Sequence, residues 1–486
     1  MIDHLDGAVG GALEQVVIRH HRKRLGKLGQ RSVLTPVPTS PGDGPVDDLW
    51  VPGTRPPRPG NSVDVLIDGD QAFAAMADAF AAARSHIHIA GWHLTPELRL
   101  RRDAGFPSLR DLLAELAERV DVRVLLWAGP PVPLFAPTRP SVQRIRAALT
   151  AGTAVECELD ARERTLHCHH EKIVVIDDEV AFVGGIDLST LSGDRWDRNA
   201  HLPRGATGWH DVATRLRGPV VADVAGHFRD RWQEVAGSSL PAPVEPPAAG
   251  DVTVQLLRTV PEATYRFAER GEFSILDAYL RALSGAQRFI YLENQFLWSA
   301  EIVETLAAKL RTPPTPDFRL VLLLPARPSN GKDTTRGQLG RLLDADDGRG
   351  LVLPTTIRAL HEDRKDPLYV HAKVGIIDDR WLTIGSANLN EHSLFNDTEV
   401  NILTQDPALA RSTRLRLWAE HLQQPESDID GDPVEVIDTQ WKPRAEDQLQ
   451  LDLAGGAATH RLIRLAAVSR RSERLMGPAR GLLVDG

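Results

Sequence analysis

Two copies of one short motif contain the residues whose types and spacing could perform chemistry. Each copy has a histidine, a lysine two positions later, an apolar run and an aspartate: His170, Lys172 and Asp177 in the first, and His371, Lys373 and Asp378 in the second. On a β-strand, period-two alternation places the histidine and the lysine on one face of the sheet. A neutral imidazole can attack phosphorus, and a neighbouring ammonium can hold phosphate oxygens. Two such pairs facing each other would supply a nucleophile, a general acid and two cations.

The spacing of the copies and the use of lysine indicate that the repeat is not accidental. The two histidines are 201 positions apart, and a glycine follows each motif at the same offset, at Gly184 and Gly385. Only 8 of the 57 basic residues are lysines, and two of these eight lie in the motif, where a compact ammonium differs chemically from a guanidinium. A period this long is not that of a solenoid and indicates duplication of a domain.

The duplicated motif, with its trailing Gly184-Gly185 or Gly385-Ser386, resembles that of the phospholipase D superfamily. The resemblance covers residues 61 to 425 and extends to four further segments, 193–197, 209–212, 227–232 and 291–296. It implies catalytic roles for the histidine, the lysine and the aspartate of both motifs.

The resemblance also implies residues that support the substrate phosphate after each motif. Asn388, in a Gly-Ser-x-Asn pattern with Ser386, should bind a phosphate oxygen through its amide. Asp187 stands at the matching place and departs from this pattern, because a carboxylate there would repel phosphate. We expect Asp187 to hold Lys172 or another cation instead.

The aspartates that end the two motifs have a second interpretation. The pairs Asp177-Asp178 and Asp378-Asp379 are typical of hairpin turns, which favours a supporting structural role for both motif aspartates.

A catalytic histidine also needs an orienting group that fixes its tautomer. The resemblance implies an acidic residue some distance after each motif. Asp197 lies 27 positions after His170, and Glu399 lies 28 positions after His371. These two carboxylates are the candidates, with Asp194 as the alternative to Asp197.

Two further groups of polar residues admit more than one interpretation. Residues 167–170, His-Cys-His-His, could suggest a metal site, but their spacing matches no usual zinc arrangement and adjacent strand residues point to opposite faces. We therefore expect no metal and no other cofactor. Residues 209–211, Trp-His-Asp, could support the site or could simply pack in the core.

Composition limits the classes of protein that fit. The 486 residues are 42% hydrophobic and 25% charged, as in an ordinary globular protein, and the net charge of −9 argues against a broad basic face for nucleic acid. The two cysteines, Cys157 and Cys168, do not make a disulfide framework. No apolar run of membrane-spanning length and no signal-peptide pattern is present, so we expect a cytoplasmic protein, with peripheral attachment to the inner face of the membrane.

The order of apolar patterns predicts an α/β fold made of two duplicated sandwich halves, with the motif strands facing a shared cleft. The expected strands are residues 63–67, 86–91, 122–127, 171–176, 180–183, 252–257, 289–293 and 319–324, and the expected helices are 71–85, 109–119, 273–283 and 300–310. The expected parts are a basic helix and proline-rich segment at 1–60, the halves at 61–235 and 251–425, a linker at 236–250 and a tail at 426–486.

Two basic segments lie outside the halves, at residues 19–27 and 461–474. The second has apolar and basic residues at helical spacing. Such a helix could pack on the body of the protein or lie on anionic lipid.

The resemblance implies hydrolysis of a glycerophospholipid headgroup, by default that of phosphatidylcholine, through a phosphohistidine that could also transfer to alcohols. We expect His170 to be the nucleophile and His371 the general acid, and a monomer that acts on phospholipid at a membrane surface without binding nucleic acid. The alternatives are a transferase of cardiolipin synthase type, a family nuclease and a lipid-binding module without catalysis. That module would not need both histidines and both lysines.

Overall fold

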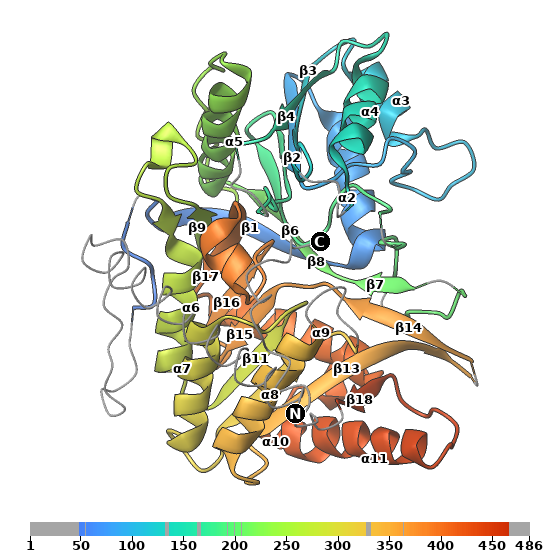
Figure 1. The fold of residues 1–486 in the computed structure, drawn as a ribbon, viewed down its shortest axis with the longest axis vertical. Helices are drawn as coiled ribbons and strands as arrows, with labels where there is room; N and C mark the ends of the chain where they lie inside the picture. Colours follow the sequence, from blue (N-terminus) through green and yellow to red (C-terminus); the bar gives the residue numbers. More distant parts are fainter. Residues whose placement is uncertain are drawn as a thin grey trace, which may run out of the picture.

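The computed structural model describes residues 48–53, 55–131, 136–162, 167–191, 193–198, 200–205, 207–326, 332–362 and 364–465. The helix expected over residues 1–30 and the basic residues beyond 465 lie outside these ranges. Figure 1 shows the first half, coloured blue to green, next to the second half, coloured yellow to red.

The first half is built on one mixed sheet with the strand order β4-β3-β2-β5-β6-β8-β1. Strands β2, β3 and β4 are parallel to each other, and the remaining neighbours are antiparallel. The strands are β1 Arg58–Ile67, β2 His86–Gly91, β3 Asp121–Trp127, β4 Glu156–Asp160, β5 Ile173–Ile176, β6 Val180–Gly184 and β8 Val212–Arg217.

The second half repeats this order as β13-β12-β11-β15-β16-β17-β9, with the same parallel and antiparallel neighbours. The strands are β9 Val252–Val260, β11 Phe289–Glu293, β12 Arg319–Leu323, β13 Val352–His361, β15 Val374–Ile377, β16 Trp381–Gly385 and β17 Glu399–Thr404. Strands β1 and β9 pair with each other and join the two sheets. The expected α/β class with duplicated halves is confirmed.

Helices cover both faces of each sheet, and the alternation along the motif strand assigns its side chains to two cores. The helices are α2 Asp68–Ala82, α3 Leu109–Leu116, α4 Arg139–Thr150, α5 Val220–Ala236, α6 Ser274–Gly285, α7 Ala300–Arg311, α8 Lys332–Asp346 and α9 Pro407–Leu422. On β5, Val174 and Ile176 pack in the core under α2, α3 and α4. Ile173 and Val175 face the core that contains α5 and α9 and strands of both halves. The motif strand is therefore buried on both faces, which fixes its register.

Tight turns follow both motif strands. Asp177 and Asp178 have φ of 55° and 57°, and Asp378 and Asp379 have 53° and 49°, the left-handed conformation that two-residue hairpin turns require. The Asp177 carboxylate accepts hydrogen bonds from the backbone N–H groups of residues 84, 85 and 86, and the Asp378 carboxylate accepts them from residues 287, 288 and 289. Each aspartate thus ties its turn to the start of the neighbouring antiparallel strand, β2 or β11.

The remaining elements connect the halves or close their edges. They are β7 Gly208–His210, β10 Glu272–Phe273, β14 Arg364–Val370, β18 Leu462–Arg464, α10 Pro433–Val436, α11 Lys442–Leu453, the 3-10 helices Arg266–Ala268 and Glu426–Asp428, and the π-helical turns His392–Asn396 and Ile437–Trp441. Strand β7 of the first half pairs in parallel with β14 of the second.

The start of the second basic segment is a strand, so the helix expected from residue 461 is wrong where the structure describes it. Leu462 is buried, and β18 pairs with the open edge of β13. The helical spacing extends over only a few residues, and tertiary pairing overrides so weak a local preference. Among the described residues, no helix is both long enough and apolar enough to cross a membrane.

Candidate active site

The two motif histidines lie at the junction of the halves, and each is held by the half opposite its own. Both side chains are almost completely buried. The backbone N–H of His170 donates to the carbonyl of Thr398 at 2.9 Å, and that of His371 donates to the carbonyl of His210 at 2.8 Å. The strands therefore deliver both imidazoles to one place.

The imidazole of His170 is oriented by a carboxylate from the second half. Its Nδ1 lies 2.9 Å from Oε1 of Glu399, which is fully buried. The hydroxyls of Ser386 and Ser393 also donate to Glu399. This arrangement holds the carboxylate, which fixes the orientation and the tautomer of the His170 ring.

The imidazole of His371 is oriented by a carboxylate from the first half. Its Nδ1 lies 2.6 Å from Oδ2 of Asp211, whose Oδ1 accepts the N–H of Val212 at 2.8 Å. A Cβ at Gly185 would lie 2.1 Å from Oδ1 of Asp211, so only glycine fits there. The second half has Ser386 at the matching place, where its hydroxyl donates to Glu399. The Gly-Gly and Gly-Ser pairs are thus two ways of accommodating an orienting carboxylate.

The orienting groups differ from those expected by spacing. Glu399 contacts His170 and not the expected His371, and Asp197 contacts neither motif histidine: it pairs with His201 at 3.2 Å and with Arg204 at 2.5 Å. The alternative, Asp194, pairs with Arg102 and Arg204. Spacing along the sequence of one half could not reveal that the carboxylate of each half contacts the histidine of the other. The Trp-His-Asp segment at 209–211, which supplies Asp211, was the available signal.

The two motif lysines have different surroundings. Lys172 donates to the carbonyl of His170 at 2.6 Å and forms an ion pair with Asp187 at 3.3 Å, as expected for that aspartate. Lys373 donates to the carbonyl of His371 and to Oε1 of Gln295 at 3.3 Å.

Asn388 lies beside Lys373 and also donates to Oε1 of Gln295, at 3.3 Å. Gln295 is a site residue that the sequence did not single out, although it lies in the family-like segment 291–296.

Burial lowers the pKa of His371 well below its usual value, and the positive charges of Lys373 and Arg195 lower it further. Burial also raises the pKa of its partner Asp211, although Lys373 opposes this effect. Without a bound anion, His371 is therefore a neutral imidazole. An indole lies near the ring of each motif histidine, with Trp209 centred 4.5 Å from His371 and Trp92 6.4 Å from His170.

The structure does not support a catalytic role for Asp177 and Asp378. Both carboxylates are engaged by backbone amides in the turns at the opposite ends of the motif strands from the histidines. They fix the hairpins that position the lysines and histidines, which is the supporting role that the turn pattern favours.

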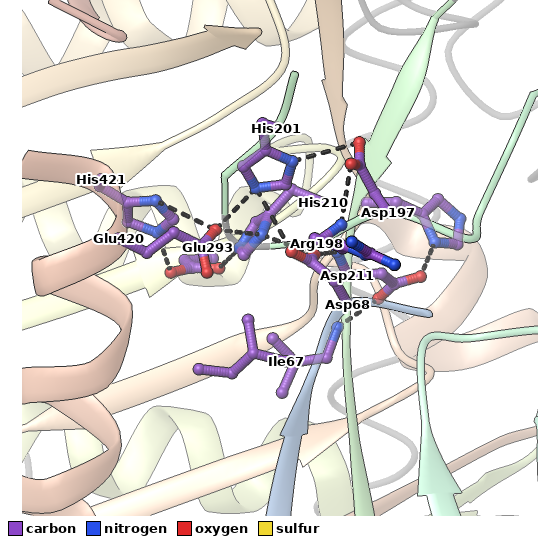
Figure 2. A network of polar contacts seen from close by, with 12 residues as sticks. Ile67, Asp68, Asp197, Arg198, His201, His210, Asp211, Glu293, Glu420 and His421 are labelled. Atoms are coloured by element: carbon purple, nitrogen blue, oxygen red, sulfur yellow. Dashed lines mark hydrogen bonds and ion pairs between the residues drawn. The ribbon is translucent and has the colours of Figure 1, made fainter. Parts of the chain in front are cut away.

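A second polar cluster lies close by and contains one group of residues that could hold a metal ion. One ligand atom each from Asp68, His201, His210 and Glu420 lies within 4.8 Å of the others, and all four side chains are buried (Figure 2). The second ring nitrogen of His201 faces Asp197, and that of His210 faces Glu293 at 2.9 Å. Carboxylates commonly support metal-binding histidines in this way.

Protonation of His201 and His210 could also balance the carboxylate charges of this cluster. Burial alone would lower the pKa of His201, but the charges of Asp68 and Glu420 outweigh it and raise that pKa to about 9. The pKa of His210 is raised well above its usual value by Glu420, Asp68 and Glu293 against the same effect of burial. Two protons or one divalent cation could therefore balance the two central carboxylates.

The His-Cys-His-His segment does not converge on one ion. His169 contacts Thr398 at 2.5 Å, whereas Cys168 packs beside Trp92 and Trp127. His167 instead lies 3.3 Å from His392, with Asp397 nearby, in a separate group that could hold a metal.

Comparison with known proteins agrees with the geometry. A family model described as "Phospholipase D" matches residues 200–306, and one described as "Cardiolipin synthase, PLD-like domain" matches residues 279–419. The chain belongs to the phospholipase D superfamily.

Relatives in this superfamily have low sequence identity to this chain, but the matches extend over most of its length. "Phospholipase D A" of Dictyostelium discoideum is 26% identical over 76% of this chain, which spans 36% of that protein's length. "Phospholipase D alpha 1" of Oryza sativa subsp. japonica is 26% identical over 78% of this chain and 68% of its own length. A crystal structure of phosphatidylserine synthase from Haemophilus influenzae has a TM-score of 0.51 at 11% identity, covering 77% of this chain and 91% of that one. The last likeness concerns the fold alone.

Proposed function

We propose that the protein is a phosphodiesterase of phospholipase D type that cleaves the headgroup of glycerophospholipids to give phosphatidic acid. The observation that carries this proposal is the crossed pairing of His170 with Glu399 and of His371 with Asp211. Each pairing fixes Nδ1 and leaves Nε2 for chemistry, and a lysine lies two residues from each ring. The site thus has two equivalent imidazoles, as a two-step displacement at phosphorus needs.

In the first step, Nε2 of His170 attacks phosphorus, and the bond to the headgroup oxygen breaks. His371 gives its Nε2 proton to the departing alcohol. In the second step, His371 takes a proton from water, which attacks phosphorus and releases His170. Lys172, Lys373 and Asn388 would stabilise the charge on the phosphorane oxygens.

The low pKa of His371 fits this sequence because the group must change its protonation state twice. An anionic diester next to His371 would raise the pKa of His371 and so favour its protonated, acid form. When His371 has given its proton to the departing headgroup, it is neutral again and can act as a base. We assign His170 as the attacking group and His371 as the acid because the superfamily resemblance implies these roles.

Phosphatidylcholine at a membrane surface is the proposed substrate, acted on by a cytoplasmic, peripheral monomer that does not bind nucleic acid. A cardiolipin synthase-like transfer to an alcohol is the second candidate, favoured by the family model that matches residues 279–419. A nuclease is less favoured because the net charge is −9.

A product assay on mixed-lipid vesicles with plasmid DNA in the same tube tests the proposal. We expect phosphatidic acid and intact DNA. His170→Ala and His371→Ala should each lower turnover on the order of 10⁴-fold or more. The exposed His361 on the β13–β14 hairpin provides the matched control, His361→Ala, which should keep full activity. Turnover that survives both catalytic substitutions would refute the proposal.

A further inference from the structure

Arg195 is a buried arginine that lacks an ion-pair partner among the described residues. Other buried arginines hold a carboxylate: Arg229 pairs with Asp178, and Arg414 with Asp379. Arg195 is only 4% exposed, yet within the described ranges no carboxylate forms an ion pair with it. A buried charge is costly unless a partner compensates it. Among the described residues, carboxylates therefore act on this guanidinium only at longer range, and none contacts it directly.

The guanidinium has one edge fixed and one edge unused. Nη1 donates to the carbonyls of Ser189 at 2.9 Å and Leu191 at 3.1 Å. Nε is buried and makes no hydrogen bond with a described residue. The edge formed by Nε and Nη2 presents two parallel donors, the geometry that binds two oxygens of a phosphate.

Close packing fixes Arg195 in place. Its guanidinium carbon lies 4.1 Å from the ring centroid of Trp209, the same indole that covers His371. A Cβ at Gly193 would lie 1.9 Å from Nε1 of Trp209, and a Cβ at Gly69 would lie 1.9 Å from the carbonyl oxygen of Arg195. A side chain at Gly69 would therefore displace Arg195, and a side chain at Gly193 would displace the indole on which the guanidinium stacks.

The charge of Arg195 acts on groups from both halves of the site. Beside the larger effect of burial, it lowers the pKa of His93 in the first half and that of His371 in the second. It also interacts electrostatically with Asp187 and Asp211 of the first half and with Tyr369 of the second. Arg195 therefore lies within electrostatic range of both halves of the site.

The need for another cation follows from Asp187. This carboxylate neutralises Lys172, whereas the matching residue of the second half is the neutral Asn388. Without a further cation, the Lys172–Asp187 pair brings no net positive charge to an anionic substrate. Arg195 belongs to the connection after β6, residues 185–207, which is longer than its counterpart after β16, residues 386–398.

We propose that Arg195 binds non-bridging oxygens of the substrate phosphate and of the phosphohistidine, and so supplies the net positive charge of the first half of the site. This inference rests on the proposed function for the identity of the phosphate group. It extends that function by naming a third cation outside the two motifs.

Binding of inorganic phosphate to the full-length protein tests Arg195 directly. In isothermal titration calorimetry, Arg195→Gln should weaken phosphate binding on the order of 10- to 100-fold. Arg195→Lys should fall between Arg195→Gln and the wild type because it keeps the charge and loses the paired donors. Phosphate should also raise the melting temperature of the wild type more than that of Arg195→Gln.

Arg198, on the same connection, provides the matched control. Its side chain is 63% exposed and contacts Asp70 at 3.5 Å, so Arg198→Gln should bind phosphate as the wild type does. Folded Arg195→Gln with wild-type phosphate affinity, or wild-type protein without phosphate binding at millimolar concentration, would overturn the inference.

Turnover of a short-chain soluble phospholipid separates this inference from the proposed function. If the wild type binds phosphate through Arg195 but hydrolyses no lipid, the proposed function fails and the inference stands. If lipid is hydrolysed while Arg195→Gln keeps both its phosphate affinity and its kcat, only the inference fails.

Discussion

Glu399 of the second half accepts a hydrogen bond at 2.9 Å from Nδ1 of His170 in the first half. Asp211 of the first half has the reciprocal relationship with His371. Neither half therefore contains a complete catalytic group, because each histidine depends on the other half for its tautomer.

Because each motif histidine is oriented by a carboxylate of the opposite half, substitution of that carboxylate by its amide should lower kcat. Glu399→Gln and Asp211→Asn should each lower kcat by on the order of 10²- to 10⁴-fold, since the amide favours the wrong tautomer or holds none. Asp197→Asn should have a smaller effect on kcat because Asp197 contacts neither catalytic ring. Steady-state kinetics on a short-chain substrate would measure all three.

Glu118→Gln, on the exposed surface of the first half, provides the control for these substitutions and should leave kcat unchanged. If Asp197→Asn were as damaging as Asp211→Asn, the crossed assignment would be wrong.

The buried histidine cluster predicts that stability falls in alkaline solution. The pKa of His201 is raised from 6.5 to about 9 in the folded protein, so its protonated form favours folding. This contribution is fully present below pH 6.5 and is lost as the pH rises through about 9. Protonation of His201 contributes on the order of 3 kcal/mol to the free energy of unfolding. Urea unfolding from about pH 6 to pH 10 should show the decline.

His201→Asn should flatten that part of the stability profile, whereas His361→Ala should keep it. A wild-type profile that is level between neutral pH and pH 9 would contradict the raised pKa.

We expect turnover to survive a chelator on a detergent-dispersed substrate. Lys373 supplies positive charge beside His371, and we propose that Arg195 supplies it in the first half of the site, so a divalent ion is not needed for that purpose. The metal content of the same sample should be measured, to verify that the chelator has removed bound ions. Loss of turnover that calcium or magnesium restores would assign a required ion, and the Asp68–His201–His210–Glu420 cluster would be the first place to locate it.

The phosphatidyl group should transfer to added alcohols. A covalent phosphohistidine waits for an acceptor, and His371 in its base form can deprotonate any hydroxyl that reaches it. With ethanol or butanol present, phosphatidyl-alcohol should form at the expense of phosphatidic acid, as mass spectrometry of the lipid products would show. Configuration at a chiral phosphorus should be retained because two in-line displacements cancel. Inversion would mean direct attack by water without the covalent step.

The basic segments at the two ends of the chain should contribute to vesicle binding. Each cation near an anionic surface contributes about 1 kcal/mol, screened by salt. Deleting residues 1–30 and 466–486 should weaken co-sedimentation with anionic vesicles and spare turnover of a short-chain substrate. The second deletion begins at 466 because Leu462 is buried in β18 and its removal would disturb the fold. Unchanged co-sedimentation would remove these segments from the membrane-binding role.

The sequence predicted the architecture well where a strand is apolar and a helix strongly periodic. Strand β2 at 86–91 and strand β11 at 289–293 are as expected, and the expected partner of the motif strand is β6. The helices α4, α5, α8 and α9 were missed. Polar residues dominate the sequences of α4 and α8, and α5 and α9 place charged residues such as Arg231 and Arg414 inside the core. The strand β18 was missed because it exists only through its pairing with β13.

Contacts between site residues could be predicted where the two residues are close in the sequence, and could not be predicted where they are far apart. The Lys172–Asp187 pair follows from one motif and its trailing segment. Glu399 lies 229 residues from His170, and Asp211 lies 160 residues from His371, so only the packing of one half on the other brings them together. Gln295 and Arg195 belong to the same class of residue, since their roles depend on neighbours from distant segments.

The parallel pairing of β7 with β14 has a consequence for how the chain tolerates changes in length. Tyr369 stands opposite Trp209 and Val370 opposite His210, and the next residue on each strand is His371 or Asp211. Because side chains alternate, one residue gained or lost here would send His371 to the wrong side of the strand. Single-residue indels next to His371 or Asp211 should therefore abolish activity, whereas the turn that joins β13 to β14 should accept them. A library of such indels, sorted by turnover, would map this boundary to a few residues.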